Sequence, residues 1–387
     1  MPVRWVVLCG SFLAYLFDAL EIILLSLALP AVRGEFGLSP AAGGLLATAT
    51  LLGIGLSSVV AGHFADNHGR KLALLGSLLV FGVGTAVLYV VPNFEVFLLL
   101  RFVAGIGLGG VWSAVSAYVV ETWPARHRGR AAAFVLSSFP LGGALAAVLS
   151  GLLLPDWRLL FLVAGAAVVL PLVVVWVFFP ESEEWQRSRA TEAPARIAEI
   201  FAPNLRRNTI LGTAVAALAL TGWWGGSTWL PTYLAGERGL PTGTVAVFMT
   251  VLNLGMFLGY NAFGLIADRI GRRSALILSL AGVAVTLPLY ALATDHVLLL
   301  WLGPLFAFFA AFVGIFGAYF GELFPTRVRT TGAGFCFNVG RGVSAFAPLL
   351  LGSLAQQISL AGGLLVCAVF FLGAALLMTL LPRTALT

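Results

Sequence analysis

The chain has 387 residues, of which 60% are hydrophobic and 10% are charged, with a formal net charge of +6. Soluble domains average about 25% charged residues, so this composition excludes a water-soluble globular protein and indicates a chain whose solvent is lipid. The positive charge does not indicate nucleic-acid binding, because the arginines fall in short clusters between apolar runs and form no single basic face.

Apolar runs long enough to cross a bilayer follow one another along the sequence. A membrane-spanning helix needs about 20 apolar residues, and continuous rather than alternating runs indicate helices instead of strands. The first six runs lie near residues 5–30, 40–64, 72–92, 95–120, 130–154 and 157–179. The other six lie near residues 209–235, 241–266, 274–293, 297–321, 331–354 and 360–381. The sequence therefore predicts an all-α membrane protein with 12 transmembrane helices.

A polar stretch separates the two sets of six runs. We expect an N-terminal six-helix half at residues 1–180, a cytoplasmic linker at 181–207 and a C-terminal six-helix half at 208–387. With the N-terminus placed inside, the inner segments hold 17 arginine and lysine residues and the outer segments hold 3. Basic residues concentrate on the cytoplasmic side of membrane proteins, so both termini are expected to be cytoplasmic.

Two segments of the first half recur in the second half. Residues 62–71, GHFADNHGRK, recur as residues 264–273, GLIADRIGRR, at an offset of 202. Residues 121–134, ETWPARHRGRAAAF, recur as residues 322–335, ELFPTRVRTTGAGF, at an offset of 201. Because two independent segments agree on one shift, the two halves are predicted to be homologous and to have the same orientation. Parallel halves favour alternating access to a site between them.

These motifs resemble those of the major facilitator superfamily. The pattern G-x-x-x-D-x-x-G-R-[KR] occurs in both halves, RFVAGIGLGG begins at Arg101, and PES begins at Pro180. FDALEI in the first run, STWLPTYL in the seventh and GFCFNVGRG in the eleventh resemble the proton-coupled organic-acid symporters, whose branches include sialate, lactate, aromatic-acid and niacin-type carriers. The resemblance implies the major facilitator fold, symport of a small organic anion with a proton, and a bacterial inner (plasma) membrane.

The repeated motif places an aspartate and an arginine at matching positions of two tight loops. We interpret it as a cytoplasmic gate, because a carboxylate contact that exists in only one of two states shifts the balance between them. The resemblance implies this role for Asp66 in particular, whereas a purely topological role is the alternative for the arginines. Glutamates near the ends of spans 4 and 10 are candidates to pair with these arginines. The expected gating residues are Asp66, Gly69, Arg70, Glu121, Asp268, Arg272 and Glu322.

Two carboxylates, Asp18 and Glu21, interrupt the first apolar run. At a rise of 1.5 Å per residue, Asp18 is about 20 Å into the span and thus near the midplane, and Glu21 follows on the same helix face. A charged residue costs about 2.5–3.5 kcal/mol at the centre of a span, so acids placed there usually have a function. We interpret Asp18 as the proton carrier and Glu21 as a second, coupled acid. The resemblance links Arg101 of span 4 to proton coupling, and an ion pair of these acids with Arg101 is the structural alternative.

Arg341 lies near the midplane of the eleventh run, with Asn338 on the same helix face. Its repeat counterpart in the first half is Pro140, so the arginine belongs to the second half only. A guanidinium suits a carboxylate, to which it donates two parallel hydrogen bonds. We predict that Arg341 binds a substrate carboxylate, with an internal salt bridge as the alternative. The further candidate substrate contacts, each of which is otherwise a packing residue, are Asn338, Asn253, Tyr260, Trp224 and Thr228.

The sequence thus favours a monomeric secondary transporter that carries a small organic anion together with a proton. A proton-coupled sugar symporter and a drug/proton efflux antiporter are the alternatives, and Arg341 disfavours a cationic drug. A membrane enzyme or a channel is less favoured still. There is no G-x-x-x-x-G-K-[ST] nucleotide loop and no metal-ligand spacing of histidines and cysteines, so we expect no cofactor, metal or catalytic residue. The expected partners are the anion, the proton and the lipid bilayer.

Overall fold

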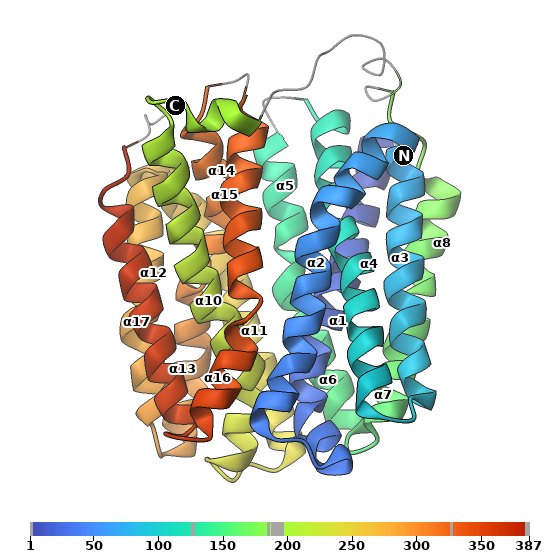
Figure 1. The fold of residues 1–387 in the computed structure, drawn as a ribbon, viewed down its shortest axis with the longest axis vertical. Coiled ribbons are helices and arrows are strands. Elements are labelled where there is room, and N and C mark those ends of the chain that lie inside the picture. The colour runs from blue at the N-terminus through green and yellow to red at the C-terminus, as the bar shows by residue number, and fades with distance from the viewer. Residues whose placement is uncertain (1–2, 125–127, 184–185, 187–196, 326–327, 384–387) are drawn as a thin grey trace.

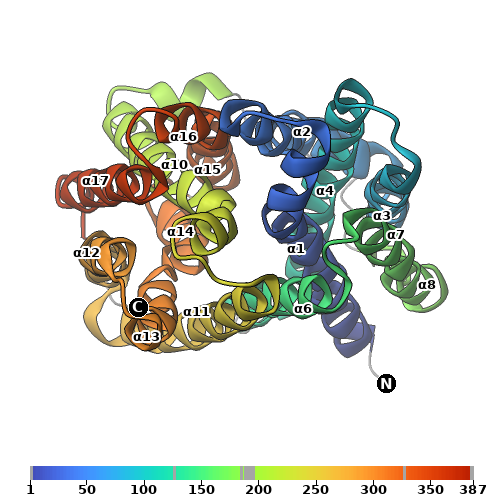
Figure 2. The ribbon, with the colours of Figure 1, turned by 90° about the horizontal axis from the view of Figure 1, so that it is seen from below.

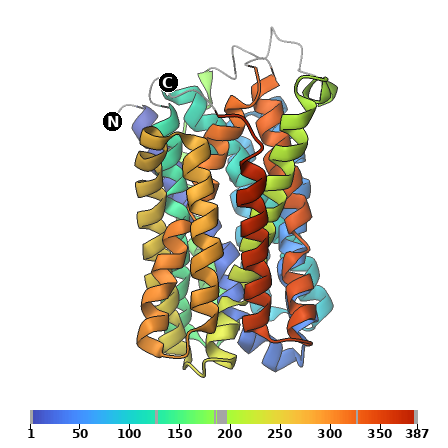
Figure 3. The same cartoon turned by 90° about the vertical axis from the view of Figure 1, so that its left-hand side faces the viewer.

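The computed structural model describes residues 3–124, 128–183, 186, 197–325 and 328–383. These residues form α-helices and short 3-10 helices, with no strand among them. The long helices run side by side along the longest dimension of the molecule (Figures 1 and 3). Viewed along the helices, they form two neighbouring bundles, one from each half of the chain (Figure 2).

Each bundle consists of consecutive helices of one half. The N-terminal bundle contains α1 (Val3–Phe36), α2 (Pro40–His68), α3 (Arg70–Ala86), η1 (Val87–Val90), α4 (Phe94–Thr122), α5 (Arg128–Leu136), α6 (Ser138–Leu153), α7 (Trp157–Ala167) and α8 (Val169–Phe178). The short helix η3 (Ile197–Phe201) precedes the C-terminal bundle. This bundle contains α10 (Arg206–Gly236), α11 (Thr242–Ile270), α12 (Arg272–Leu292), α13 (His296–Phe309), α14 (Phe312–Glu322), α15 (Arg329–Ser344), α16 (Ala347–Ala355) and α17 (Leu360–Met378).

The described chain contains 12 segments that are long and apolar enough to cross a membrane, six in each bundle. They correspond one for one to the apolar runs of the sequence, so the predicted fold class is confirmed. Large apolar side chains cover the outside of the bundles; Leu152, Trp176 and Leu265, for example, are 74%, 65% and 64% exposed. Such a surface is stable against lipid tails but not against water, and the chain is an integral, multi-pass membrane protein.

Four spans consist of two α-helices rather than one, which the apolar runs do not predict, and the third span ends in the 3-10 helix η1. Helices α5, α7 and α15 end at Leu136, Ala167 and Ser344, each four residues before a proline. A proline ring clashes with the carbonyl four residues earlier and removes a hydrogen bond, which accounts for these breaks. Proline alone does not dictate a break, because Pro30, Pro231, Pro288 and Pro304 lie inside helices that continue through them. The fourth break, after Phe309, has no such proline; there the Ser279 hydroxyl donates to the Phe309 carbonyl at 2.5 Å.

The internal repeat is visible in matching contacts. The Tyr118 hydroxyl donates to the Pro180 carbonyl at 3.1 Å, and the Tyr319 hydroxyl, 201 residues later, donates to the Pro382 carbonyl at 2.9 Å. Gly69 and Gly271, 202 residues apart, are single-residue connections with φ angles of 106° and 85°. Only glycine adopts such angles without strain, which explains why both copies of the motif contain it.

The two bundles contact each other most extensively through α6 with α11, α2 with α16 and α1 with α10, and less extensively through α2 with α15 and through α5 with α11 and α14. The tightest approach is at the start of α2, where a Cβ atom on Gly44 would lie 2.4 Å from the Pro348 carbonyl oxygen. Likewise, a Cβ atom on Gly352 would lie 2.5 Å from the Pro40 carbonyl oxygen. Both chain termini lie at the opposite end of the molecule (Figure 1). The halves are therefore joined firmly at the end away from the termini.

Candidate functional site

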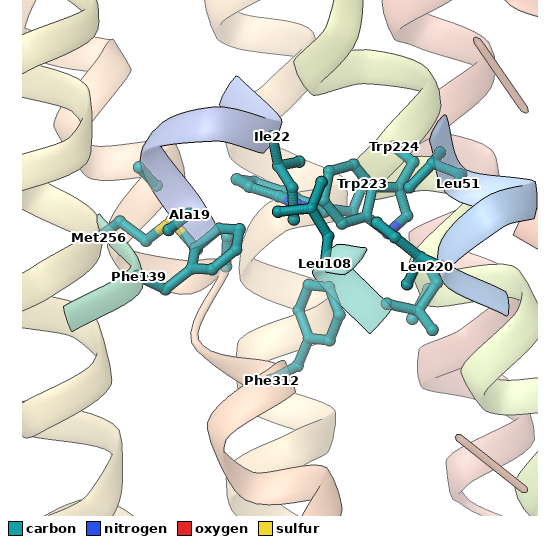
Figure 4. Packing of buried hydrophobic residues seen from close by; sticks show 14 of the residues in the cluster. Ala19, Ile22, Leu51, Leu108, Phe139, Leu220, Trp223, Trp224, Met256 and Phe312 are labelled. Atoms are coloured by element: carbon teal, nitrogen blue, oxygen red, sulfur yellow. The ribbon is translucent and has the colours of Figure 1, made fainter. Parts of the chain in front are cut away.

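A cavity of about 270 Å³ lies between the two bundles, and both halves line it. Its walls are largely aromatic, with Tyr15, Trp112 and Phe139 from the first half and Trp223, Trp224, Tyr260 and Phe337 from the second. Figure 4 shows apolar side chains of both halves, including Phe139, Trp223 and Met256, gathered in the middle of the molecule. A molecule bound here touches both halves, which is the arrangement that alternating access requires.

Arg341 supplies the positive charge of this lining. It follows Asn338 by one turn of α15, and both side chains line the cavity. Arg341 makes no ion pair with any carboxylate that the structure describes, although its charge interacts electrostatically with Asp18. Tyr260 and Trp224, also predicted from the sequence, line the same cavity. The arrangement leaves a guanidinium available to a ligand inside an apolar chamber.

Asp18 lies on α1 and is only 3% exposed. Its Oδ1 atom is buried and accepts no hydrogen bond from the described residues. The charges that act on it are those of Arg341 and Glu21. Burying a carboxylate without a hydrogen-bond partner is costly in its ionised form, so this group is suited to changing its protonation state.

Glu21 has quite different surroundings from Asp18, although the two acids are three residues apart. Its Oε1 atom pairs with Arg101 at 2.8 Å, and both side chains are 0% exposed. Thr85 donates to the same Oε1 at 2.6 Å, and Arg101 donates through Nε to Thr50 at 3.1 Å. The expected pairing of the span 1 acids with Arg101 is therefore made by Glu21, within the N-terminal bundle.

Close packing of α2 against α4 holds this ion pair in place. A Cβ atom on Gly105 would lie 2.2 Å from the Thr50 carbonyl oxygen, and one on Gly53 would lie 2.3 Å from the Phe102 carbonyl oxygen. Small residues let transmembrane helices approach closely. The glycine pattern that follows Arg101 in the sequence thus brings Thr50 of α2 within hydrogen-bond distance of Arg101.

Asn253 and Thr228, predicted as substrate contacts, line a second and much smaller cavity of about 30 Å³ instead. Thr228 donates to the Trp224 carbonyl at 2.7 Å, and Asn253 donates through Nδ2 to the Met249 carbonyl at 2.7 Å, so both polar groups are bonded within their own helices. Phe139, Trp223 and Trp224 line both cavities. These three rings therefore stand between the larger cavity and the smaller one.

Sequence reasoning missed the contribution of the first half to the cavity. Tyr15 lies one turn before Asp18, and its ring is 5.0 Å from that of Trp112 and 6.0 Å from that of Phe139, measured between centroids. The spacing from Asp18 was a usable signal for Tyr15. Trp112 and Phe139 carry no such signal, because an aromatic residue in a span packs equally well against lipid, another helix or a ligand.

The described residues form no group of three or more His, Cys, Asp and Glu side chains that is able to hold a metal ion. Cys336 and Cys367 are buried in the C-terminal bundle, whereas Cys9 is exposed on α1. Buried thiols of this kind behave as small apolar packing residues.

The repeated motif forms matching ion pairs at the end of the molecule that carries the termini. Arg70 pairs with Glu121 at 3.0 Å, and Arg272 pairs with Glu322. In the first half, Glu181 also accepts hydrogen bonds from the backbone N–H groups of Arg70 and Lys71, at 2.8 and 3.3 Å. A carboxylate at the first turn of α3 satisfies backbone donors that have no partner within the helix. A Cβ atom on Gly69 would lie 2.4 Å from this carboxylate, so the contact requires glycine.

The aspartates of the motif lie in helices, not in the predicted loops. Asp66 belongs to α2, which continues to His68, and Asp268 belongs to α11, which continues to Ile270. The connection between the two helices of the motif is a single glycine in each half, because one glycine is enough to reverse the chain direction there. The Asp268 side chain is exposed, and the Asp66 side chain lies outside the side chains that the structure describes.

The family model described as Major Facilitator Superfamily matches residues 8–261. The chain belongs to the major facilitator superfamily. The superfamily member "Cis,cis-muconate transport protein" of Acinetobacter baylyi is 33% identical to it over 92% of this chain and 89% of that protein. The "Sialic acid transporter NanX" of Escherichia coli is 27% identical over 94% of this chain and 90% of that protein. These relatives match the organic-acid branches that the sequence motifs resemble.

A solved structure shares the fold of this chain. The crystal structure of a D-xylose-proton symporter superposes with a TM-score of 0.83 at 18% sequence identity, and the match covers 100% of this chain and 99% of that one. At this identity the likeness establishes the arrangement of the helices alone.

Proposed function

We propose that the protein is a secondary active transporter that carries a small organic anion together with a proton. The observation that carries the proposal is the position of Arg341, in the lining of a cavity shared by both halves and without an ion pair among the described carboxylates. An unpaired cation near the midplane costs several kcal/mol, and an anionic substrate offsets that cost. Muconate and sialic acid, named in two of the relatives, are both carboxylates, which supports an anion.

Neutral and cationic substrates fit the cavity less well. A sugar needs many hydrogen-bonding side chains, whereas the polar side chains in the described lining are few and most of the wall is aromatic or aliphatic. A lipophilic cation would meet the like charge of Arg341. The sugar symporter and the cation antiporter are therefore weaker readings of this site.

Asp18 is the proton carrier in this proposal, and Glu21 is the fixed partner of Arg101. With no substrate bound, the charge of Asp18 offsets that of Arg341. A substrate carboxylate takes over that role, after which the ionised form of Asp18 loses its stabilisation and binds a proton. Anion and proton are thereby carried together.

The two six-helix halves, at residues 1–180 and 208–387, are the bodies that move in this proposal, and one chain is the working unit. With both termini in the cytoplasm, the firm contact of α2 with α16 lies on the outer side. The structure then corresponds to an inward-facing state. The motif residues Asp66, Gly69 and Asp268 act in closing the cytoplasmic side. The ion pairs Arg70–Glu121 and Arg272–Glu322 each lie within one half and hold the helices of the motif in position for that closure.

The test is a thermal-shift panel of carboxylates, neutral sugars and cationic drugs on the purified protein at two pH values. A binder stabilises the folded state by mass action. We expect a carboxylate to bind, Arg341→Lys to weaken its binding because the planar fork is lost, and Arg341→Gln to remove nearly all of it. Unchanged affinity in Arg341→Gln, or a wild type that binds only sugars or cations, would contradict the proposal.

A further inference from the structure

Tyr15 occupies the position between the proton site and the substrate site. It is one turn before Asp18 on α1, and its side chain lines the cavity that contains Arg341. Its ring rests against Trp112 of α4 and Phe139 of α6, so its position is fixed by packing within the N-terminal half. Its phenol interacts electrostatically with Asp18, Tyr260 and Arg341.

The polar groups around Tyr15 have few partners of their own. Neither the Tyr15 nor the Tyr260 hydroxyl forms a hydrogen bond with a residue that the structure describes, and Asp18 has a buried oxygen without a donor. Arg341 completes the group from the other half. Two hydroxyl donors and one guanidinium thus line the same cavity with hydrogen bonds free for a ligand, and the buried Asp18 follows Tyr15 by one turn of α1.

We propose that the Tyr15 hydroxyl transmits substrate binding to Asp18, an inference that rests on the proposed function. A phenol has a single proton to donate, so Asp18 and a bound carboxylate compete for it. When a substrate carboxylate accepts a hydrogen bond from Tyr15 and pairs with Arg341, the Tyr15 hydroxyl is no longer able to donate to Asp18, and Asp18 loses the counter-charge of Arg341 at the same time. It then binds a proton from the aqueous side to which the cavity is open. Tyr15 is a positioning residue in this scheme and does not itself change protonation state.

The other titratable groups near α1 do not replace Tyr15 in this role. Glu21 and Arg101 neutralise each other, and Arg158 of α7 pairs with Glu35 at 2.7 Å. Helices α6 and α8 contain no titratable residue. The remaining described groups on helices packed against α1 lie away from Asp18, near helix ends, and are His68 of α2, Glu95, Tyr118 and Glu121 of α4, and Arg206, Arg207 and Tyr233 of α10. Arg4 and Arg33 lie near the two ends of α1 itself, and His63 and Asp66 of α2 are outside the described side chains. Arg128 and Arg130, at the start of α5, are outside the described side chains.

The experiment measures the affinity for a carboxylate from the panel between pH 5.5 and 8, in wild type and Tyr15→Phe. Because binding of substrate and proton is reciprocal, wild-type affinity rises as pH falls, by up to about tenfold per pH unit for one coupled proton. In Tyr15→Phe we expect the carboxylate still to bind through Arg341, with this dependence reduced to about threefold per unit or less.

Tyr260→Phe is the matched control. It removes a hydroxyl of the same cavity that belongs to α11 of the other half, whereas Tyr15 lies on α1 together with Asp18. Its affinity should fall at every pH while the wild-type dependence on pH is kept. If the carboxylate affinity of Tyr15→Phe depends on pH as strongly as that of wild type, the inference is overturned and the proposed function stays intact. Carboxylate binding that survives in Arg341→Gln overturns the proposed function instead. If Tyr15→Phe does not fold, Tyr15→Leu provides the same test.

Discussion

The first membrane span carries two carboxylates whose surroundings differ in kind. Glu21 is bound by a guanidinium and a threonine hydroxyl inside one bundle, whereas Asp18 is buried without an ion pair among the described residues and interacts electrostatically with Arg341 of the other bundle. Removing one partner of a buried ion pair leaves an uncompensated charge, whereas neutralising an unpaired carboxylate removes a cost. The two acids should therefore lose different amounts of stability when each is replaced by its amide.

We expect Glu21→Gln to lower the free energy of unfolding by about 3–5 kcal/mol, because the Arg101 charge remains buried. Asp18→Asn should lower it less, because the loss of an unpaired buried charge offsets the lost interaction of Asp18 with Arg341. Thermal unfolding of both variants in the same detergent measures the difference. If Asp18→Asn proves to be the more destabilising of the two, the assignment of a structural role to Glu21 and a mobile proton to Asp18 is reversed.

Helix α4 shows how glycines set the position of a charged side chain. Gly105 faces the backbone of α2 at a distance that leaves no room for a methyl group. Gly76 of α3 has no atom within 4 Å of an added Cβ. The same substitution at these two positions therefore separates the effect of packing from that of helix propensity.

Gly105→Ala should destabilise the protein by about 1–3 kcal/mol, because the backbones of α2 and α4 are forced apart. Gly76→Ala should be neutral or stabilising by up to about 1 kcal/mol, because alanine favours the helix. Thermal unfolding compares the pair. Equal stability of both variants would show that the approach of α2 to α4 is not needed to hold Arg101.

Element boundaries illustrate what a membrane sequence reveals. The apolar runs predict where the 12 spans lie, because lipid demands about 20 apolar residues for each crossing. They do not show the breaks at Leu136, Ala167 and Ser344, since an interrupted helix is as apolar as a continuous one. Pro140, Pro171 and Pro348 were the readable signals for those breaks.

The sequence predicted only those residues of the candidate site whose side chains cost free energy in lipid. Arg341 and Asp18 stand out because a charge near the midplane needs a reason. Trp112 and Trp223 do not stand out, because aromatic side chains occur equally in contact with lipid, in the protein core and in binding sites. When a helix is apolar on all sides, its neighbours decide which side is turned toward the cavity and which toward lipid. A single sequence does not show that rotation.

At the scale of the whole molecule, we propose that the repeated motif links the two halves to one change of state. Asp66→Asn should shift the population toward the inward-open state. The shift is measured as increased labelling of cysteines introduced on the cytoplasmic side. Asp268→Asn, at the matching position, should have a smaller effect because the resemblance implies the role for Asp66 in particular. Unchanged labelling on both sides of the membrane in Asp66→Asn would count against a gating role.

The central claim is that a carboxylate and a proton cross together through the cavity of Arg341, with Asp18 carrying the proton. The direct measurement follows proton and carboxylate entry in proteoliposomes when only a carboxylate gradient is imposed. We predict that protons enter with the carboxylate in wild type, and that Asp18→Asn abolishes proton-driven accumulation while still exchanging carboxylate across the membrane. Carboxylate entry without proton movement in wild type, or wild-type proton movement in Asp18→Asn, would contradict the account.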